Sequence, residues 1–350
     1  MSQPIRVATV GAGWVSTNRH IPSLHRNIDV DLVGMVVPDG ELRGDRRADL
    51  TAKYGLSHFG PSLDDGWLDD VDAVVMGTPP ETHPQLVCAA LERGLHVLVE
   101  KPFALTVADA DRMIETADEE GKILAVVHNL QFGLAASKTR RLLRSGALGE
   151  LRGVYGVQSS NHQRRLPTWY KELPLGLFTD EAPHLVYLLQ SFLEDAEVEM
   201  LHVGRPLSAD DRTPDLVSMV LRSADGVPGS LQMTFVGAVS EWMLVVMGTK
   251  GTVVADFFRD VCFTIPDDKG HLTPDVLRTQ AAAVGGHLGG TFRAGVARLR
   301  GHLDYGNDEV MRRFIAAVQT GVAPEGISGV NGRNVVAVLE AAHRASGHAG

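Results

Sequence analysis

Cysteine is almost absent from this sequence, whose 350 residues include only Cys88 and Cys262. Two cysteines exclude a disulfide framework or a cysteine-rich zinc site, and they suit a reducing compartment. No apolar run approaches the ~20 residues that span a bilayer, and no signal-peptide hydrophobic region follows the first methionine. We therefore expect a cytoplasmic protein with no membrane contact and no metal.

Positive charge is outweighed by negative charge: 33 lysines and arginines against 43 aspartates and glutamates give a formal net charge of −10. That balance argues against a general affinity for nucleic acid or anionic membranes. The rest of the composition, with 44% hydrophobic and 22% charged residues, is that of a globular protein. A chain of 350 residues has room for two domains and a sizeable core.

The first part of the chain alternates short apolar runs with helical segments, from residue 5 to residue 127. This alternation predicts βαβ units and a parallel sheet covered on both faces. We expect an α/β fold whose first domain, residues 1–128, is a Rossmann dinucleotide-binding domain. The expected strands are Arg6–Val10, Asp31–Val37, Ala73–Gly77, His96–Val99 and Ile123–Val127.

Neighbouring strands dominate the chain after residue 150, beginning with Leu151–Ser159. They predict a largely antiparallel sheet, so we assign residues 129–350 to a second domain of α+β type. A helix is expected around Phe178–Phe192, and the final helices of the chain are candidates to pack back on the first domain. The pairs Gly285-Gly286 and Gly289-Gly290 predict a mobile loop, followed by a short helix at Phe292–Leu299.

A glycine-rich turn follows the first expected strand and reads Gly11-Ala12-Gly13-Trp14-Val15-Ser16. This is the dinucleotide fingerprint with serine in the third glycine position. The first glycine permits a tight turn, and the second lets the backbone approach a pyrophosphate at the start of the next helix. We predict that Gly11, Gly13, Trp14 and Val15 bind NAD or NADP, although a purely structural turn would have the same glycines.

The choice between NAD and NADP depends on the end of the second strand. Asp39 follows that strand, where a carboxylate accepts hydrogen bonds from an adenosine ribose and favours NAD. The same residue also suits a simple turn, because Pro38 and Gly40 flank it. Arg43, Arg46 and Arg47 come next and are able to meet a 2′-phosphate. The sequence therefore leaves the choice between NAD and NADP open and slightly favours NAD.

Two loops are expected at the carboxyl edge of the sheet, where ligands bind in open α/β folds. One is Glu100-Lys101-Pro102, which follows an apolar strand and presents an ammonium group that can polarise an oxygen. The other is Thr78-Pro79-Pro80, with His83 at the start of the next helix. We place Thr78, Pro79, His83, Glu100 and Lys101 beside the cofactor. The alternative for Lys101 is an ordinary surface lysine at the end of a strand.

In the second domain, Asp180 and His184 stand four residues apart, which puts both side chains on one helical face. Imidazole is the usual general base near neutral pH, and a nearby carboxylate can orient it. The alternative is a solvent-facing ion pair. The preceding loop carries Trp169 and Tyr170, which offer an apolar face to a sugar ring or serve as ordinary core residues. Arg164 in that loop is a candidate contact for an anionic substituent.

Taken together, these motifs resemble the glucose–fructose oxidoreductase/inositol dehydrogenase/MocA (Gfo/Idh/MocA) family over nearly the whole chain. The resemblance implies a Rossmann domain and a second α/β domain whose open sheet serves as an oligomer interface, hence a homodimer or homotetramer. The matching pieces are Gly11-Ala12-Gly13, Thr78-Pro79-Pro80 with His83, Glu100-Lys101-Pro102, Gly149-Glu150-Leu151, Asp180 with His184, and Gly248-Thr249-Lys250-Gly251.

The resemblance also implies a reaction, the reversible NAD(P)-dependent oxidation of a secondary alcohol on a sugar, amino sugar or cyclitol. Lys101 matches the family's active-site lysine, and Asp180 with His184 matches its acid/base pair. The sequence departs from the family at Tyr187, where an aspartate is usual, and at Gln131, where an arginine is usual. These departures bear on the substrate more than on the reaction type.

The expected mechanism is hydride transfer between the nicotinamide and the carbinol carbon of a small polyhydroxylated substrate. His184 takes the hydroxyl proton, while Lys101 stabilises the developing charge on the same oxygen. Two alternatives share the fold. One uses bound NAD transiently for epimerisation or glycoside cleavage, and the other is a non-enzymatic regulator that senses the dinucleotide.

Overall fold

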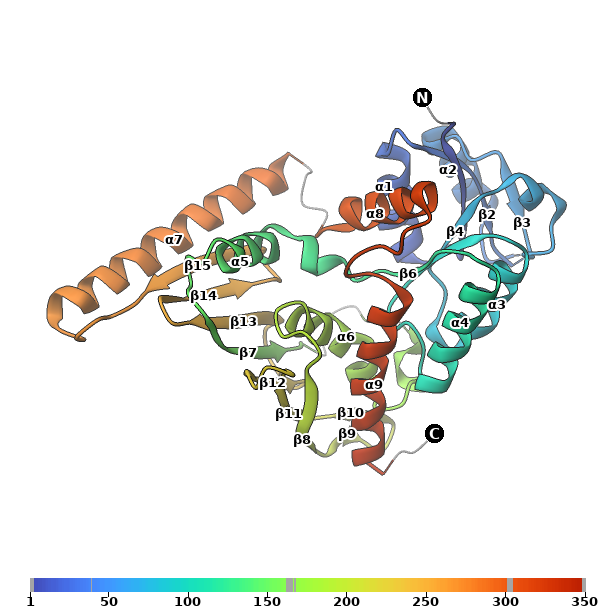
Figure 1. Ribbon diagram of the computed structural model, residues 1–350. Coiled ribbons are helices and arrows are strands. Elements are labelled where there is room, and N and C mark those ends of the chain that lie inside the picture. Colours follow the sequence, from blue (N-terminus) through green and yellow to red (C-terminus); the bar gives the residue numbers. More distant parts are fainter. Residues whose placement is uncertain (1–2, 39, 162–165, 167, 301–304, 348–350) are drawn as a thin grey trace. The chain divides into compact units, whose positions relative to one another are not determined.

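The structure is a computed structural model that describes residues 3–38, 40–161, 166, 168–300 and 305–347. Its ribbon is shown in Figure 1. The chain divides into two compact units, of which the first comprises residues 1–129 and 307–340. The second comprises residues 130–306 and 341–350.

The first unit is built on a six-stranded sheet with the order β3-β2-β1-β4-β5-β6, and every neighbouring pair is parallel. The order reverses between β1 and β4, and ligands of doubly wound sheets bind at such a reversal. The predicted Rossmann architecture is confirmed. The strands are β1 Ile5–Val10, β2 Val30–Val36, β3 His58–Gly60, β4 Ala73–Met76, β5 His96–Val99 and β6 Leu124–Val126.

Helices flank this sheet and complete its core. In α4, Thr106 caps the first turn by accepting a 3.1 Å hydrogen bond from the Asp109 amide. Near the end of the chain, Arg333 binds Asp111 of α4, with 2.6 Å between Nε and Oδ1. The helices are α1 Ile21–Arg26, α2 Gly44–Tyr54, α3 His83–Glu92, α4 Val107–Glu119, α8 Asn307–Thr320 and α9 Gly329–Ala345, of which the residues up to 340 belong to this unit.

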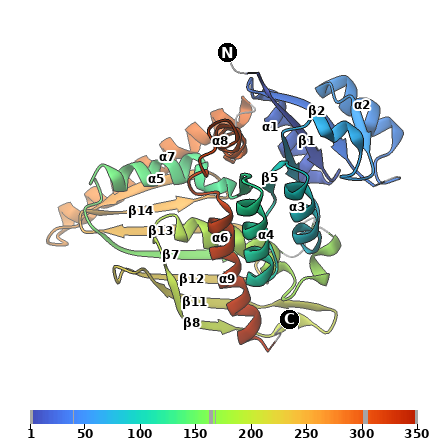
Figure 2. The ribbon, with the colours of Figure 1, turned by 45° about the vertical axis from the view of Figure 1, so that its right-hand side comes forward.

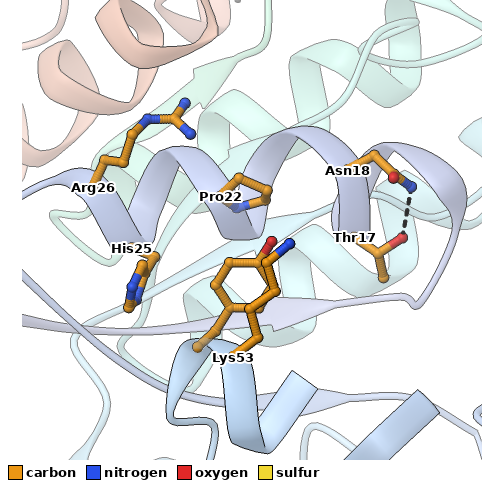
Figure 3. A pocket seen from close by; sticks show the side chains of 7 residues that line it. Thr17, Asn18, Pro22, His25, Arg26 and Lys53 are labelled. Carbon is orange, nitrogen blue, oxygen red and sulfur yellow. Dashed lines mark hydrogen bonds between the residues drawn. The ribbon is translucent and has the colours of Figure 1, made fainter. Parts of the chain in front are cut away.

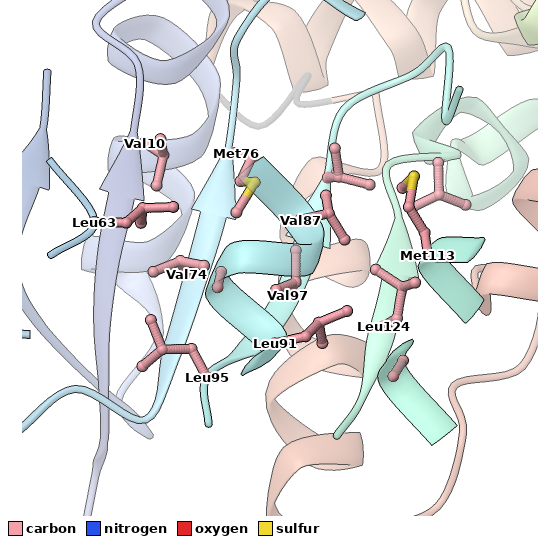
Figure 4. Packing of buried hydrophobic residues seen from close by; sticks show 14 of the residues in the cluster. Val10, Leu63, Val74, Met76, Val87, Leu91, Leu95, Val97, Met113 and Leu124 are labelled. Carbon is pink, nitrogen blue, oxygen red and sulfur yellow. The ribbon is translucent and has the colours of Figure 1, made fainter. Parts of the chain in front are cut away.

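The core of the first unit lies between its sheet and these helices (Figure 4). Val74 and Val97 on the central strands are fully buried and share one cluster with Leu91 of α3 and Met113 of α4. Val336 of α9 belongs to the same cluster. Full burial of each such side chain contributes about 1.5–3 kcal/mol, so the core holds the strand ends in fixed positions.

The second unit contains a seven-stranded sheet with the order β15-β14-β13-β7-β12-β11-β8. Figure 2 labels its strands from β14 to β8. Only β7 and β12 pair in parallel, and the other neighbours are antiparallel. This confirms a largely antiparallel second sheet. The strands are β7 Leu151–Ser159, β8 Glu197–Val203, β11 Leu216–Arg222, β12 Pro228–Thr234, β13 Glu241–Gly248, β14 Gly251–Asp256 and β15 Val261–Pro266.

Two helices cover one face of that sheet. The helix α6, Leu177–Gln190, packs on β7 and β12, and α5, Leu134–Arg144, packs on β14 and β15. A small hairpin of β9, Pro206–Ser208, and β10, Asp211–Pro214, lies apart from the main sheet. Along β11 buried and partly exposed residues alternate, as expected for a sheet covered on one face.

The expected mobile loop around the two glycine pairs is wrong. Residues Thr273–Leu299 form one continuous helix, α7, of 27 residues. A Cβ atom at Gly286 would lie 2.8 Å from the Phe263 Cβ, and one at Gly290 would lie 2.7 Å from Val261 Cγ1. These glycines let α7 lie directly on β15, and this packing offsets a helix-propensity cost of about 1 kcal/mol for each glycine.

Candidate functional site

The dinucleotide turn has the geometry that its glycines predict. Gly11 adopts φ +91°, and its amide donates to the Val36 carbonyl at 2.9 Å. A Cβ atom at Gly11 would lie 2.9 Å from the Gly77 carbonyl oxygen, so a side chain has no room there. Ser16, in the third glycine position, is fully buried against Gly77. The turn therefore brings β1, β4 and the start of a helical segment together.

A helical segment runs from Ser16 into α1 directly after this turn. Trp14 is half exposed, and the Arg19 guanidinium lies 5.4 Å from the centre of its ring. Helix amino termini next to glycine turns bind pyrophosphate through backbone amides. The arrangement therefore fits the diphosphate of NAD or NADP.

The residues that bear on cofactor preference are only partly described, because Asp39 lies outside the described residues. Arg43 pairs with Asp45 at 3.2 Å, and the Arg47 guanidinium lies 4.8 Å from the centre of the Phe59 ring. Arg46 donates to Thr17 Oγ1 at 2.8 Å, close to the fingerprint turn. All three arginines thus have partners within the first unit.

A pocket beside α1 lies near these residues, and Figure 3 shows its lining. His25, Arg26 and Lys53 give it a basic character. Neither the fingerprint glycines nor Lys101 lines it, so we do not assign the nicotinamide to this pocket. Its lining residues are Thr17, Asn18, Pro22, His25, Arg26, Lys53 and Tyr54.

Lys101 is held at the carboxyl edge of the sheet by the residue before it. The Glu100 side chain is only 12% exposed, and its Oε1 accepts from Nε2 of the fully buried His20 at 2.8 Å. Its Oε2 accepts from the Lys101 amide at 3.0 Å. Burial alone raises the pKa of Glu100, but the His20 hydrogen bond and the charges of His20 and Lys101 outweigh it and lower that pKa. Glu100 is therefore a carboxylate that fixes the Lys101 backbone.

His83 joins the two loops at this edge. Its Nδ1 lies 2.9 Å from the Pro102 carbonyl oxygen, and its Nε2 lies 3.0 Å from that of Thr78. Burial lowers the pKa of His83 despite these carbonyls, so the ring is neutral near pH 7. A neutral ring donates from one nitrogen only. The fully buried His83 side chain therefore links the loop at Thr78 to the loop at Pro102.

In the second unit, α6 begins at a position that requires glycine. Gly176 adopts φ +52°, and a Cβ atom there would lie 2.4 Å from Thr213 Oγ1. The same hydroxyl accepts the Leu177 amide at 2.9 Å. Asp180, in the first turn of α6, is buried with 7% exposure. This burial rules out the alternative of a solvent-facing ion pair.

His184 is fixed by aromatic residues of the second unit. Its ring stacks on Trp242 of β13, with 4.9 Å between centroids and 29° between planes. Its Nδ1 lies 3.0 Å from Tyr187 Oη, and that oxygen accepts the Leu130 amide at 3.0 Å. Tyr187, noted in the sequence only as a departure from the family, therefore orients the imidazole. No local sequence pattern links Trp242 to His184, because Trp242 lies on β13 and His184 lies on α6.

Buried polar residues adjoin Asp180. Glu181 is buried and accepts hydrogen bonds from Gln158 Nε2 at 3.1 Å and from the Ser160 hydroxyl. Gln158 lies on β7, and Ser160 directly follows that strand. Sequence reasoning did not single out these residues. Glu181 is therefore a second buried carboxylate on α6, directly after Asp180.

The proposed sugar-facing residues differ in their surroundings. The Tyr170 ring is buried, and its hydroxyl donates to Asp211 Oδ2 at 2.8 Å. Burial and this hydrogen bond raise the pKa of Tyr170 to about 12. Trp169 lies in the same 3-10 helix, Thr168–Glu172, and is partly exposed. Arg164 lies outside the described residues.

Within the described ranges, no three histidine, cysteine, aspartate or glutamate side chains gather as metal ligands would. In the same part of the chain, no helix has both the length and the apolar character to cross a bilayer.

These features define the class of protein, which combines a Rossmann dinucleotide-binding unit with an α+β unit. Two family models match the chain. One, described as an oxidoreductase family with an NAD-binding Rossmann fold, matches residues 5–128. The other, described as the GFO/IDH/MocA C-terminal domain, matches residues 136–254. The chain belongs to the Gfo/Idh/MocA oxidoreductase family, which confirms the resemblance seen in its motifs.

Individual relatives are more distant. The chain is 35% identical over 130 residues to 4-carboxy-2-hydroxymuconate-6-semialdehyde dehydrogenase of Sphingobium sp., spanning 37% of this chain and 39% of that protein. It is 26% identical over 273 residues to myo-inositol 2-dehydrogenase of Thermotoga maritima, spanning 76% of this chain and 79% of that protein.

Solved structures show the same fold. GenD2 from gentamicin A biosynthesis, in complex with NAD, superposes with a TM-score of 0.76. The match covers 99% of this chain and 95% of that chain at 22% sequence identity. At this identity the likeness establishes the fold alone.

Proposed function

We propose that this protein is an NAD(P)-dependent oxidoreductase that acts on a secondary alcohol, or the corresponding ketone, of a sugar, amino sugar or cyclitol. The observation that carries the proposal is the attachment of Lys101 to the sheet edge. Glu100, itself bound to buried His20, holds the Lys101 amide at the end of β5. A lysine whose backbone is fixed at that edge is suited to polarise an oxygen of a bound substrate with its ammonium group.

The cofactor fits the first unit. Gly11 and Gly13 leave space for a pyrophosphate, with Trp14 and Val15 beside it and Thr78 and Pro79 in the neighbouring loop. When bound, the nicotinamide accepts or donates the hydride. We favour NAD over NADP because Arg43 and Arg47 already have partners in Asp45 and Phe59. Asp39 remains our proposed contact with the adenosine ribose.

The second unit supplies the proton chemistry in this proposal. His184 takes the hydroxyl proton during oxidation and returns it during reduction. Because Nδ1 faces Tyr187, we assign this exchange to Nε2. Lys101 stabilises the negative charge that develops on the same substrate oxygen. Asp180 orients His184 or binds a neighbouring hydroxyl.

The remaining proposed substrate contacts also belong to the second unit. We propose that Trp169 offers an apolar face to the ring and that Arg164 meets an anionic substituent. Tyr170 is proposed to support this loop, since its hydroxyl is bound to Asp211. One relative is named for a cyclitol and another for a semialdehyde, so the substrate panel must be broad.

The test is absorbance of reduced nicotinamide across sugars, amino sugars and cyclitols, with NAD and NADP in parallel. We expect a substrate that produces the reduced cofactor, with faster turnover with NAD. Lys101→Ala and His184→Ala should abolish turnover yet keep dinucleotide affinity within a few fold. Either variant with near wild-type activity would show that the assigned roles are wrong.

Two rivals give different results in the same experiment. Epimerisation or glycoside cleavage with transient use of NAD would convert the substrate without accumulation of reduced cofactor. A dinucleotide-sensing regulator would bind NAD(P) and convert no compound in the panel.

We also propose a cytoplasmic homodimer or homotetramer that associates through the outer face of the second sheet. Tyr155, Val157 and Met247 are 37%, 47% and 40% exposed, and alternate along their strands with buried residues. Neither Cys88 nor Cys262 is in a disulfide, which is consistent with a reducing compartment. Val157→Asp should lower the mass of the assembly in sedimentation velocity, and an unchanged mass would argue against this interface.

A further inference from the structure

Trp242 presents an aromatic face to His184 from the second sheet. On β13, Trp242 is the direct partner of Gln158 on β7, so the two side chains lie on the same face of the sheet. The helix α6 covers that face, because Gln158 donates to Glu181 of α6 at 3.1 Å. His184 follows Glu181 by three residues and lies on the same side of the helix. The register of the two strands therefore brings the indole onto the imidazole.

The contact between the two rings has the geometry of a cation–π pair. The ring centroids are 4.9 Å apart, with 29° between the planes, inside the limit of about 6 Å at which an indole face attracts a cation. Both side chains are partly buried, and the loss of water strengthens this attraction. A neutral imidazole carries no net charge for the indole face to attract. The indole therefore favours the protonated ring over the neutral ring.

Each ring is also held by a partner of its own. The Phe258 ring lies 5.8 Å from the Trp242 ring, at 89° to its plane. The Trp242 carbonyl accepts the Phe257 amide at 2.8 Å, which ties β13 to the turn after β14. Nδ1 of His184 lies 3.0 Å from Tyr187 Oη. The fold therefore sets the stack from both sides.

Other ionisable groups lie on the elements that carry the stack. In the described part of the second unit they are Asp180, Glu181 and Tyr187 on α6, Glu241 on β13, Asp256 at the end of β14, and Arg259 and Asp260 in the turn that follows. The segment Asn129–Phe132, which contacts Tyr187, has no ionisable side chain. Replacement of Trp242 by an uncharged residue leaves all of these groups in place. A difference in pKa between the wild type and such a variant therefore reports the indole.

We propose that Trp242 is a positioning residue that raises the pKa of His184 by stabilising its protonated ring. A cation–π attraction of ordinary strength corresponds to a shift of about half a unit to one unit. A group that exchanges a proton in both directions of a reaction works best with a pKa near the working pH. The role of the imidazole in catalysis rests on the proposed function, whereas the effect of the indole on its pKa does not.

The first test is an NMR titration of the protein without substrate, labelled with ¹³C at histidine Cε1. The chain has 14 histidines, so the His184 signal is assigned by its loss in His184→Ala. Trp242→Leu should lower the pKa of His184 by about half a unit to one unit. Trp242→Phe keeps a weaker π face and should give an intermediate value. An equal or higher pKa in either variant overturns the proposal.

The direction of the shift separates the cation–π effect from loosened packing. Water that enters a loosened site would raise the pKa of a partly buried histidine, because burial disfavours its charged form. A fall in pKa therefore supports the indole effect. Trp67→Leu is the matched control, since the Trp67 indole stacks on His58 in the first unit, with 5.3 Å between centroids. It should leave the His184 titration unchanged, and a similar fall in this control would overturn the proposal.

The second test is the pH profile of kcat/KM with a substrate from the panel. The limb that reports His184 should move to lower pH in Trp242→Leu, by the shift seen in the NMR titration. Shifts in both measurements support Trp242 and the proposed function together. A shift in the NMR titration alone would support the effect of Trp242 but overturn the assignment of His184 as the group that exchanges the proton. If Trp242→Leu does not fold, Trp242→Phe decides both measurements in the same way.

Discussion

Replacement of Glu100 by glutamine removes one charge from the sheet edge while keeping the shape of the side chain. The carboxylate accepts from His20 Nε2 at 2.8 Å and from the Lys101 amide at 3.0 Å. A glutamine oxygen retains the second hydrogen bond, but its NH₂ group faces the His20 N–H. The variant therefore loses a hydrogen bond to a charged acceptor, worth about 1.5–3 kcal/mol. We expect the free energy of unfolding near pH 7 to fall by that amount.

The pH dependence of this loss separates a charge effect from simple loss of packing. The pKa of Glu100 is lowered in the folded protein from an ordinary value of 4.5. A carboxyl with a lowered folded-state pKa contributes stability above its unfolded pKa, and this contribution disappears as pH falls through the folded pKa. The difference in free energy of unfolding between the wild-type protein and Glu100→Gln should therefore be largest near pH 7. This difference should narrow below about pH 4.5.

The assay is urea unfolding of both proteins between about pH 7 and pH 4. Glu92→Gln is the control, because Glu92 is exposed at the end of α3, and its unfolding should match the wild type. A Glu100→Gln variant that is equally stable near pH 7, or whose deficit stays the same down to pH 4, would refute the reasoning. If Glu100 positions Lys101 as proposed, kcat/KM should fall as well.

Four further substitutions test other contacts. Tyr187→Phe removes the hydroxyl at 3.0 Å from His184 Nδ1. A hydrogen bond of about 1 kcal/mol implies a roughly fivefold loss in kcat/KM with unchanged cofactor affinity. Unchanged kinetics would argue that Tyr187 does not position His184. Gly290→Ala should destabilise the protein in thermal unfolding, because its Cβ would lie 2.7 Å from a β15 side chain. Gly295→Ala meets nothing within 4 Å and should stabilise it by up to about 1 kcal/mol; the reverse order would contradict the packing. Asp260→Ala removes the acceptor of the first α5 amides, at 3.0 and 2.7 Å, and should cost about 1–2 kcal/mol in urea unfolding, whereas no loss would mean that water replaces the cap.

The glycine turn and the strand–helix alternation were readable from the sequence because they are local patterns. Gly11 adopts φ +91° directly after the first strand, which the glycine spacing of the turn predicts, and hydrophobic periodicity reports which strands are buried on both faces. The position of Lys101 at the end of β5 follows from the same reasoning. The short spacing of Asp180 and His184 was sufficient to place them on one helix, α6.

The misjudged segment was α7, where glycine pairs indicated a loop. Intrinsic propensity disfavours a helix there, by about 1 kcal/mol for each glycine. The helix forms because Gly286 and Gly290 pack directly on Phe263 and Val261. This stabilising contact depends on β15, which lies outside any short window of sequence around the glycines.

By itself, the sequence determined the Rossmann class of the first unit, the dinucleotide turn at Gly11 and the placement of Lys101 at a sheet edge. Tertiary structure decided what surrounds the candidate groups: His20 bound to Glu100, and Tyr187 with Trp242 around His184. The physical reason is range. Local patterns depend on backbone sterics and periodic burial, whereas the partner of a buried polar side chain depends on which distant segments pack together.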